Sequence, residues 1–381
     1  MSNQKKNAQP PVDTALMILV LVLAVFGLII LLSASEYNGR VRFHDSAYYF
    51  KKQLFATSLG LGAMYIISTI NYRFFVRLAP AAYLLSLLLS TTVLLVGQEI
   101  NGSKRWLNLG PLSFQPSEFA KVAVILFLTW QIENSRRRTD GFWFMCRTML
   151  TLLPIVGLVG SNNLSTAIII FCITMGLIFI AHPKVKPFLI AAGVGVALII
   201  IFVMILSSSL ETSSSFRLRR ILVWLRPEDF ASGDGYQTIQ ALYAIGSGGF
   251  LGRGLGNSIQ KLGSVPEAQN DMIFSIVCEE LGILGGIILL LLFAYLLYRL
   301  FFIAQNAPDM FGSLMVSGIF IHIALQVIFN IAVVLNLMPN TGVTLPFVSY
   351  GGTSIVFLMS EMGLALSVAR QIKFKEPERL L

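Results

Sequence analysis

Charged side chains interrupt the long apolar stretches of this 381-residue sequence at few places, and they are the first candidates for chemistry. A polar residue at the depth of a bilayer is costly, so each one is a functional candidate by default. Glu118 and Lys121 open one apolar stretch directly after Pro116, which suits the first turn of a helix. Three residues apart, the two charges share a helix face. They could form a self-neutralising pair for membrane insertion or part of a functional site.

A second group of carboxylates follows a long polar segment. Asp271 stands where that segment enters an apolar run, so the positive end of a helix and its free amides would keep this carboxylate ionised. An ordinary helix N-cap is the alternative interpretation. Glu279 and Glu280 lie ~12–14 Å further along the helix axis and ~100° apart around it. Such depth requires basic partners or protonation, and Lys121 is one candidate partner.

A third group lies between residues 337 and 354, where two prolines, three glycines and several hydroxyl side chains interrupt an apolar segment. This composition predicts an irregular re-entrant loop, which a membrane tolerates only where the loop lines a protein cavity. All three groups would share one side of the membrane. They are predicted to converge on one outward-facing cavity walled by Arg105, Glu118, Lys121, Asp271 and the 339–354 loop. Such a cavity suits a transporter as well as an enzyme.

The elements that must position these side chains are transmembrane helices. The sequence is 55% hydrophobic and 12% charged, with a mean hydropathy of +0.75, which is too apolar for a soluble domain of this length. Its apolar stretches are continuous and lack the alternation of barrel strands. We predict an all-α integral membrane protein with about ten helices, at roughly 14–33, 52–70, 77–97, 116–132, 143–160, 164–181, 186–208, 270–303, 310–337 and 351–370.

The short loops on the side of both termini hold fifteen Lys and Arg residues, and those on the other side hold six. This bias predicts cytoplasmic termini. The expected plan is a cytoplasmic tail at 1–13, one polytopic membrane domain at 14–371 and a cytoplasmic tail at 372–381. The net charge of +9 follows from this bias and from contact with anionic lipids, so no nucleic-acid partner is expected.

The longest polar segment, 209–270, is predicted to be a large extracellular loop between the seventh and eighth helices. It contains two predicted short amphipathic helices, Phe216 to Leu225 and Tyr236 to Ser247, followed by a glycine-rich stretch. The three cysteines lack the spacing of metal ligands, so neither a metal site nor a disulfide framework is indicated.

Four sets of motifs follow one another along the chain. They are Asn101 to Gly110 with Gln115-Pro116-Ser117-Glu118 and Lys121, Arg219-Arg220 with Gly235-Tyr236-Gln237, Pro266-Glu267 with Asp271 and Glu279 to Gly282, and Thr344 to Phe347 with Ser349 to Gly352. The chain thereby resembles the shape, elongation, division and sporulation (SEDS) family of peptidoglycan glycosyltransferases. Gly256 to Lys261 favours the FtsW branch, and RodA or SpoVE types stay open. The family commonly has Asp where this chain has Asn163.

The resemblance implies that Asp271 is the essential carboxylate, acting as general base. Transfer to a sugar hydroxyl needs one base, and the leaving diphosphate needs charge stabilisation, so a single carboxylate suffices. Guanidinium and ammonium groups would hold the lipid diphosphates. The residues implied in substrate binding are Arg105, Glu118, Lys121, Arg219, Arg220, Glu279 and Ser349.

The resemblance further implies a multi-pass protein of the bacterial cell membrane that polymerises lipid II on the outer face during cell division. The expected partners are lipid II, which is a disaccharide pentapeptide on undecaprenyl diphosphate, a class B penicillin-binding protein, other divisome proteins and membrane lipids. No cofactor is required by the sequence, although Mg²⁺ or Mn²⁺ could assist. The alternatives are a lipid II flippase or transporter, and a scaffold for division proteins.

Overall fold

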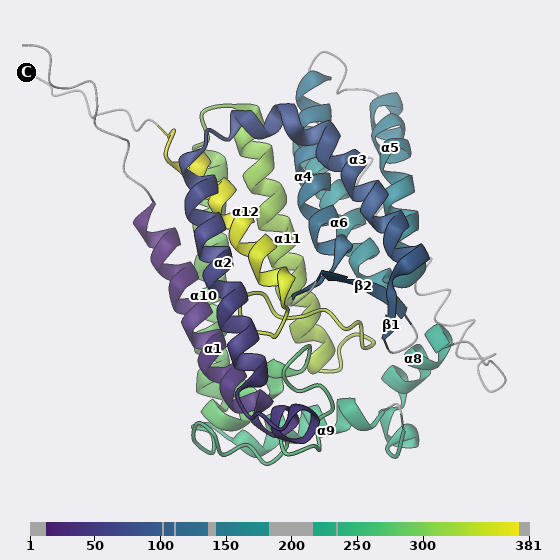
Figure 1. Cartoon of the computed structure of the whole chain (residues 1–381), viewed down its shortest axis with the longest axis vertical. Coiled ribbons are helices and arrows are strands. Elements are labelled where there is room, and N and C mark those ends of the chain that lie inside the picture. The colour runs from purple at the N-terminus through teal and green to yellow at the C-terminus, as the bar shows by residue number, and fades with distance from the viewer. Residues whose placement is uncertain are drawn as a thin grey trace, which may run out of the picture.

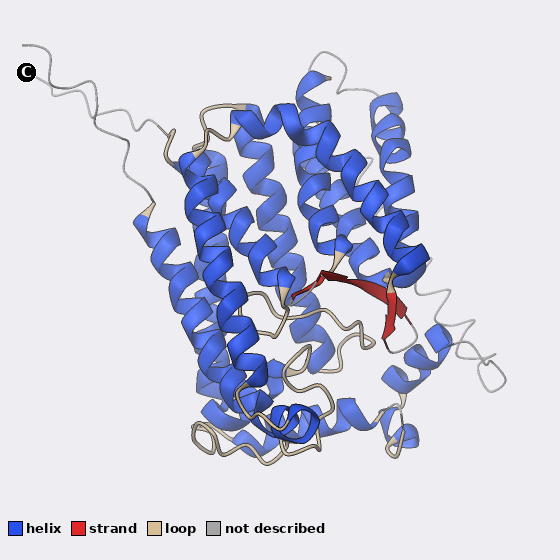
Figure 2. Ribbon diagram, viewed as in Figure 1, coloured by secondary structure: helices blue, strands red, loops and turns tan. Residues whose placement is uncertain are grey.

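The computed structural model describes residues 13–100, 103–109, 112–135, 142–182, 216–233 and 235–372. These residues are mostly helical (Figure 2). The helices are α1 Thr14–Phe43, α2 Tyr48–Thr69, α3 Arg73–Val96, α4 Pro116–Asn134, α5 Phe142–Asn162, α6 Leu164–Ala181, α8 Phe216–Leu225, α9 Tyr236–Gly248, α10 Ile273–Gln305, α11 Met310–Val334 and α12 Thr353–Ala369. A 3-10 helix, Pro227–Phe230, follows α8.

These helices confirm the prediction of a mostly helical membrane protein. Among the described residues, the helices long and apolar enough to cross a membrane on their own composition are α1, α3, α6, α10 and α11. Nine of the predicted spans fall on described helices, and the seventh, 186–208, lies outside the described residues. The total of ten and the position of the large loop therefore stay predictions. The first helix extends to Phe43 instead of ending near residue 33.

The helices form two adjoining groups (Figure 1). In one group α12 packs along α2, and α10 packs along α11 and α1. In the other group α4 packs against α3 and α6, and α5 packs against α6. The first turn of α1 and the last turn of α12 lie at the same end of the bundle, and α8 and α9 lie at the opposite end.

A small antiparallel sheet lies among the helices near the end that carries α8 and α9 (Figure 2). Its strands are β1 Gln98–Ile100, β2 Ser103–Leu109 and β3 Leu112–Phe114, in the order β1-β2-β3. The all-helical prediction missed this sheet, because two of the strands have only three residues and carry too little alternation to be detected. Arg105 of β2 lines a small pocket together with Pro116 and Ser117 at the start of α4.

The segment between α11 and α12 has the irregular conformation that the sequence predicts. It contains no helix or strand, yet it buries Leu345, Phe347 and Val348 inside the bundle. The segment packs so closely against α1 that the facing residue must be glycine. A Cβ at Gly27 of α1 would lie 2.3 Å from the Phe347 carbonyl oxygen. The segment is therefore an internal wall of the bundle.

The residues at the starts of α4 and α6 explain where these two helices begin. Gln115 is extended and Pro116 follows as the first residue of α4, so the chain turns from β3 directly into the helix. The Asn163 side chain accepts a hydrogen bond from the Thr166 amide and caps α6. Because an amide oxygen performs this capping as well as a carboxylate, the absence of an Asp at residue 163 leaves the helix start intact.

Helix α10 is broken at Gly282, which has φ 70° and ψ −175°. Residues 249–254 lie along the break and join it through four backbone hydrogen bonds of 2.9 to 3.2 Å. Two of these bonds are accepted by the carbonyls of Glu279 and Glu280, which the break frees from the helix. The segment before the break, which begins just after Asp271, is thus held by the preceding loop.

Gly282→Ala should destabilise the protein by roughly 1–3 kcal/mol or more, because this backbone conformation is available essentially to glycine alone. A Cβ there would also lie 2.3 Å from the Phe250 carbonyl oxygen. Thermal unfolding in detergent measures the effect. The matched control is Gly62→Ala in α2, where a Cβ meets nothing within 4 Å and stability should be unchanged or slightly raised. Equal stability of the two variants would contradict the prediction.

Candidate active site

A cavity of about 480 Å³ lies where β2, the start of α4, the residues before α10 and the segment between α11 and α12 meet. Its lining includes Arg105, Glu118, Lys121, Asp271 and Arg220. The structure therefore brings five of the residues proposed from the sequence into one cavity. Their roles in catalysis and substrate binding stay predictions.

Asp271 is 9% exposed and lies in the turn before α10, outside the spanning helix. The helix N-cap is Met272, and no side chain caps it, so the interpretation of Asp271 as an ordinary N-cap was wrong. The Asn330 side chain of α11 fixes the Asp271 backbone by donating to its carbonyl at 2.7 Å. The carboxylate is left to face the cavity.

The pKa of Asp271 shifts in the direction opposite to the sequence-based expectation, in which the helix end favours the ionised form. Burial raises the pKa of Asp271 to about 6; the Glu267 carboxylate acts in the same direction, and Arg220 acts in the opposite one. A carboxyl group with a pKa just below neutral is suited to accept a proton, since it is mostly ionised and still basic.

Glu118 and Lys121 form a buried ion pair at the cavity wall, with the Lys121 Nζ 3.0 Å from Glu118 Oε1. Ser354 donates to the other carboxylate oxygen at 2.7 Å. Lys121 also donates to the Gln326 side chain at 3.4 Å. The pair neutralises itself, as expected for membrane insertion, and still presents both groups to the cavity.

Two arginines from different elements face the same cavity. Arg105 of β2 donates from Nε to the Asn162 carbonyl at 2.9 Å, and Arg220 of α8 donates to the Asn340 carbonyl at 3.2 Å. Burial lowers the pKa of Arg105, and the positive charge of Arg220 lowers it further. An anion between the two guanidinium groups would relieve this repulsion, and a diphosphate matches their paired donors.

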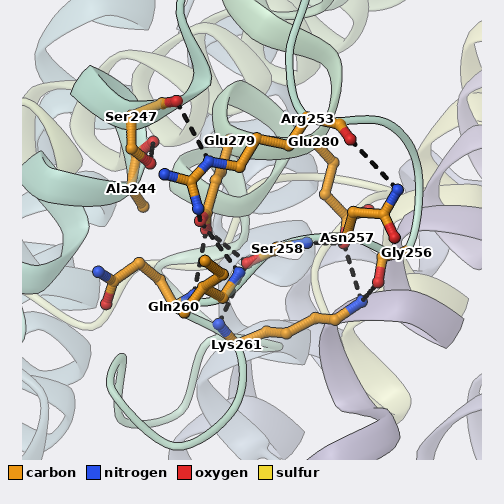
Figure 3. A network of polar contacts seen from close by, with 11 residues as sticks. Ala244, Ser247, Arg253, Gly256, Asn257, Ser258, Gln260, Lys261, Glu279 and Glu280 are labelled. Carbon is orange, nitrogen blue, oxygen red and sulfur yellow. Dashed lines mark hydrogen bonds and ion pairs between the residues drawn. The ribbon is translucent and has the colours of Figure 1, made fainter.

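Glu279 and Glu280 lie outside the lining of this cavity, in a separate buried network (Figure 3). Glu279 accepts hydrogen bonds from the Ser258 hydroxyl and from two loop amides, and its carboxylate lies 3.5 Å from Arg253. Glu280 pairs with Lys261 at 3.0 Å. The expected basic partners exist, but the choice of Lys121 was wrong.

Of the two remaining predicted residues, Ser349 lies outside the lining of the cavity, and only the backbone of Arg219 is described. Ser349 is buried, and its hydroxyl accepts from the Leu345 amide at 2.9 Å, so it holds the segment between α11 and α12 in shape. Arg219 lies in α8, and its side chain is outside the part of the chain that the structure describes.

Sequence analysis missed other residues that shape the cavity. Gln326 and Asn330 are four apart on α11. Their side chains donate hydrogen bonds to the backbone carbonyls of Thr344 and Asp271. A polar pair at helical spacing in a spanning segment was the signal that could have identified them. Arg42 and Glu267 also line the cavity. Glu267 lay within a recognised motif but was given no role.

The sequence of this chain matches the model of a family described as "Cell cycle protein", named for FtsW, RodA and SpoVE, over residues 13–374. It is 37% identical over 374 residues to "Stage V sporulation protein E" of Bacillus subtilis, covering 95% of this chain and 98% of that protein. It is 33% identical over 368 residues to "Probable peptidoglycan glycosyltransferase FtsW" of Trichlorobacter lovleyi, covering 95% of this chain and 94% of that protein.

Two solved structures are similar along nearly the whole chain. A chain described under "Structural coordination of polymerization and crosslinking by a peptidoglycan synthase complex" has a TM-score of 0.78 at 31% identity, covering 95% of this chain and 99% of that one. The rod shape determining protein RodA of Thermus thermophilus has a TM-score of 0.67 at 29% identity, covering 96% and 98%.

Proposed function

The chain belongs to the cell cycle protein family of FtsW, RodA and SpoVE, and from this premise we propose that it is a peptidoglycan glycosyltransferase that polymerises lipid II. The observation that carries the proposal is the buried Asp271 carboxylate in a cavity that it shares with Arg105, Arg220 and Lys121. One base and several cations are what the transfer of a diphosphate-linked sugar requires.

In the proposed reaction the acceptor sugar hydroxyl attacks the anomeric carbon of the donor. The new glycosidic bond forms as the bond from that carbon to the diphosphate breaks, and the diphosphate leaves with the electron pair. Asp271 takes the hydroxyl proton. Arg105, Arg220 and Lys121 stabilise the negative charge on the leaving diphosphate, so it departs without protonation.

The proposal includes the surroundings of the enzyme. The protein is a multi-pass protein of the bacterial membrane with cytoplasmic termini, and the cavity faces outward, as the distribution of Lys and Arg suggests. A class B penicillin-binding protein crosslinks the product, in line with the similarity to a chain of a peptidoglycan synthase complex. The cellular process is division, as for FtsW, with sporulation as the alternative supported by the SpoVE relative.

The proposed mechanism assigns each step to side chains of the chain itself. Among the described residues, no group of three or more His, Cys, Asp or Glu side chains could hold a metal ion. Three cations that line the cavity instead supply positive charge for the diphosphate. Polymerisation of lipid II in the presence of a chelator tests whether Mg²⁺ or Mn²⁺ assists the reaction.

The acidic limb of the pH profile tests the assignment of Asp271. A general base works only when deprotonated, so kcat/KM should fall as the pH decreases through about 6, the raised pKa of Asp271. The measurement is the initial rate of glycan formation from purified lipid II between pH 5 and 8, with stability checked at each pH. A flat profile over this range would exclude a base with such a pKa.

A transporter of lipid II is the second candidate, and the buried Glu118–Lys121 pair at the cavity wall favours it, because charges inside the bilayer line the pathways of carriers. Reconstituted vesicles distinguish the two functions. Movement of labelled lipid II across the bilayer without polymer supports the transporter, and polymer formation supports the enzyme.

A further inference from the structure

Glu267 closes the turn that carries Asp271. Its backbone has φ 51°, a left-handed conformation that non-glycine residues adopt at a cost. The Glu267 carboxylate accepts from the side-chain nitrogens of Asn270 at 2.8 Å and Gln269 at 3.2 Å. The Asn270 amide donates to the Glu267 carbonyl at 2.9 Å. The side chain and backbone of Glu267 together hold the strained turn directly before Asp271.

Other elements hold the same turn in place. Asn38 of α1 donates to the Gln269 side chain at 2.8 Å, and the Tyr350 amide donates to the Gln269 carbonyl at 2.9 Å. Gln237 of α9 donates to the Pro266 carbonyl at 3.1 Å. These contacts are neutral, so they fix the position of the turn without changing its charge.

An ion pair joins the turn to the end of α1. Arg42 Nη1 lies 2.9 Å from Glu267 Oε1. Both side chains line the cavity that contains Asp271. Arg42 is about half exposed and Glu267 about one-third exposed, so an isolated contribution to stability would be small. Because the pair lines the cavity, its charges can instead affect Asp271.

The charge around Asp271 depends on few groups. The charged and titratable side chains that line the cavity with it are Arg42, Tyr49, Arg105, Glu118, Lys121, Arg220, Glu267 and Tyr350. Glu118 and Lys121 neutralise each other. The two tyrosines are neutral near pH 7, where the phenol is protonated. Arg220 favours the ionised carboxylate, whereas Glu267 opposes it. Arg42, which is paired with Glu267 at 2.9 Å, offsets the negative charge of Glu267.

We propose that Glu267 is a positioning residue for Asp271 and that Arg42 controls it: Glu267 holds the turn, and the Arg42–Glu267 ion pair sets how much negative charge Asp271 faces. The inference rests on the proposed function, since it concerns the proposed base. It assigns to α1 a part in the chemistry of a residue more than two hundred positions later in the sequence.

The test compares the acidic limbs of kcat/KM profiles for wild type, Glu267→Gln and Arg42→Gln. Removing the carboxylate should move the midpoint to lower pH, because Asp271 loses a negative neighbour. Removing the guanidinium should move the midpoint to higher pH, because Glu267 is no longer offset. The Gln side chain of the Glu267→Gln variant can still accept from Asn270. Its plateau activity should therefore stay within about tenfold of wild type, which corresponds to the loss of roughly one charged hydrogen bond.

The matched control is Glu36→Gln, which removes an exposed ion pair with Arg40 on the same helix and should leave the midpoint unchanged. Unmoved midpoints in both test variants, or shifts in the same direction, would overturn the inference while leaving the proposed function intact. Failure of the proposed function looks different, since Asp271→Asn would then polymerise lipid II normally. A purely structural role for the pair would lower the plateau or the melting temperature without opposite shifts.

Discussion

Asp271→Asn should lose at least about a hundredfold of the glycan polymerisation rate, the usual contribution of a general base. Asn has nearly the shape of Asp but cannot accept a proton at neutral pH. The backbone contact with Asn330 involves the Asp271 carbonyl, which the substitution does not touch. The measurement is polymer formation from purified lipid II, with and without the cognate transpeptidase, by wild type and variant side by side.

The outcomes of this experiment separate the possible functions. If only wild type forms glycan strands, and thermal unfolding shows that the inactive Asn variant is folded, the protein is a glycosyltransferase with Asp271 as its base. Equal product from both proteins would show that Asp271 is not the base. No product from wild type, even with the partner present, would favour the transporter, for which the buried Glu118–Lys121 pair is the supporting observation.

Lys261→Met should destabilise the fold by about 3–5 kcal/mol, because it leaves the buried carboxylate of Glu280 without its counter-ion. The ammonium group of Lys261 lies 3.0 Å from Glu280 and 2.7 Å from the Gly256 carbonyl oxygen (Figure 3). It also donates to the Ser33 hydroxyl at 2.7 Å. Thermal or denaturant unfolding of the purified protein measures the loss.

Adding Glu280→Gln to the Lys261→Met variant should recover most of this stability, since replacing both partners of a buried pair is often nearly neutral. The matched control is Lys51→Met, which removes an exposed pair with Asp45 and should cost less than about 1 kcal/mol. If Lys261→Met were as stable as wild type, the network would not be an anchor of the loop.

The helices could be predicted because their apolar length alone distinguishes them, and nine predicted spans fall on described helices. The break at Gly282 could not be predicted, since apolar residues continue on both sides of it and a glycine within a spanning helix is ordinary. Its conformation depends on residues 249–254, which supply the missing hydrogen bonds. Tertiary packing brings this segment to the break, and the local sequence around Gly282 carries no information about that packing.

The candidate site was predictable where a charge opened an apolar stretch, as at Glu118 and Lys121, or entered one, as at Asp271. The partners of Glu279 and Glu280 were mistaken, because spacing along a straight helix gives depth but not the direction a side chain faces. Both carboxylates face the loop before α10. A cation in that loop was therefore nearer than Lys121 of another helix.

The contacts of the loop before α10 also affect how the chain inserts into the membrane during synthesis. The counter-charges of Glu279 and Glu280 come from Arg253 and Lys261, in the loop that is synthesised directly before the helix. Both carboxylates can be neutralised by residues that have already left the ribosome, before α11 and α12 exist. The ion pairs of Glu279 with Arg253 and of Glu280 with Lys261 can therefore form while α10 is being inserted, without waiting for the rest of the bundle.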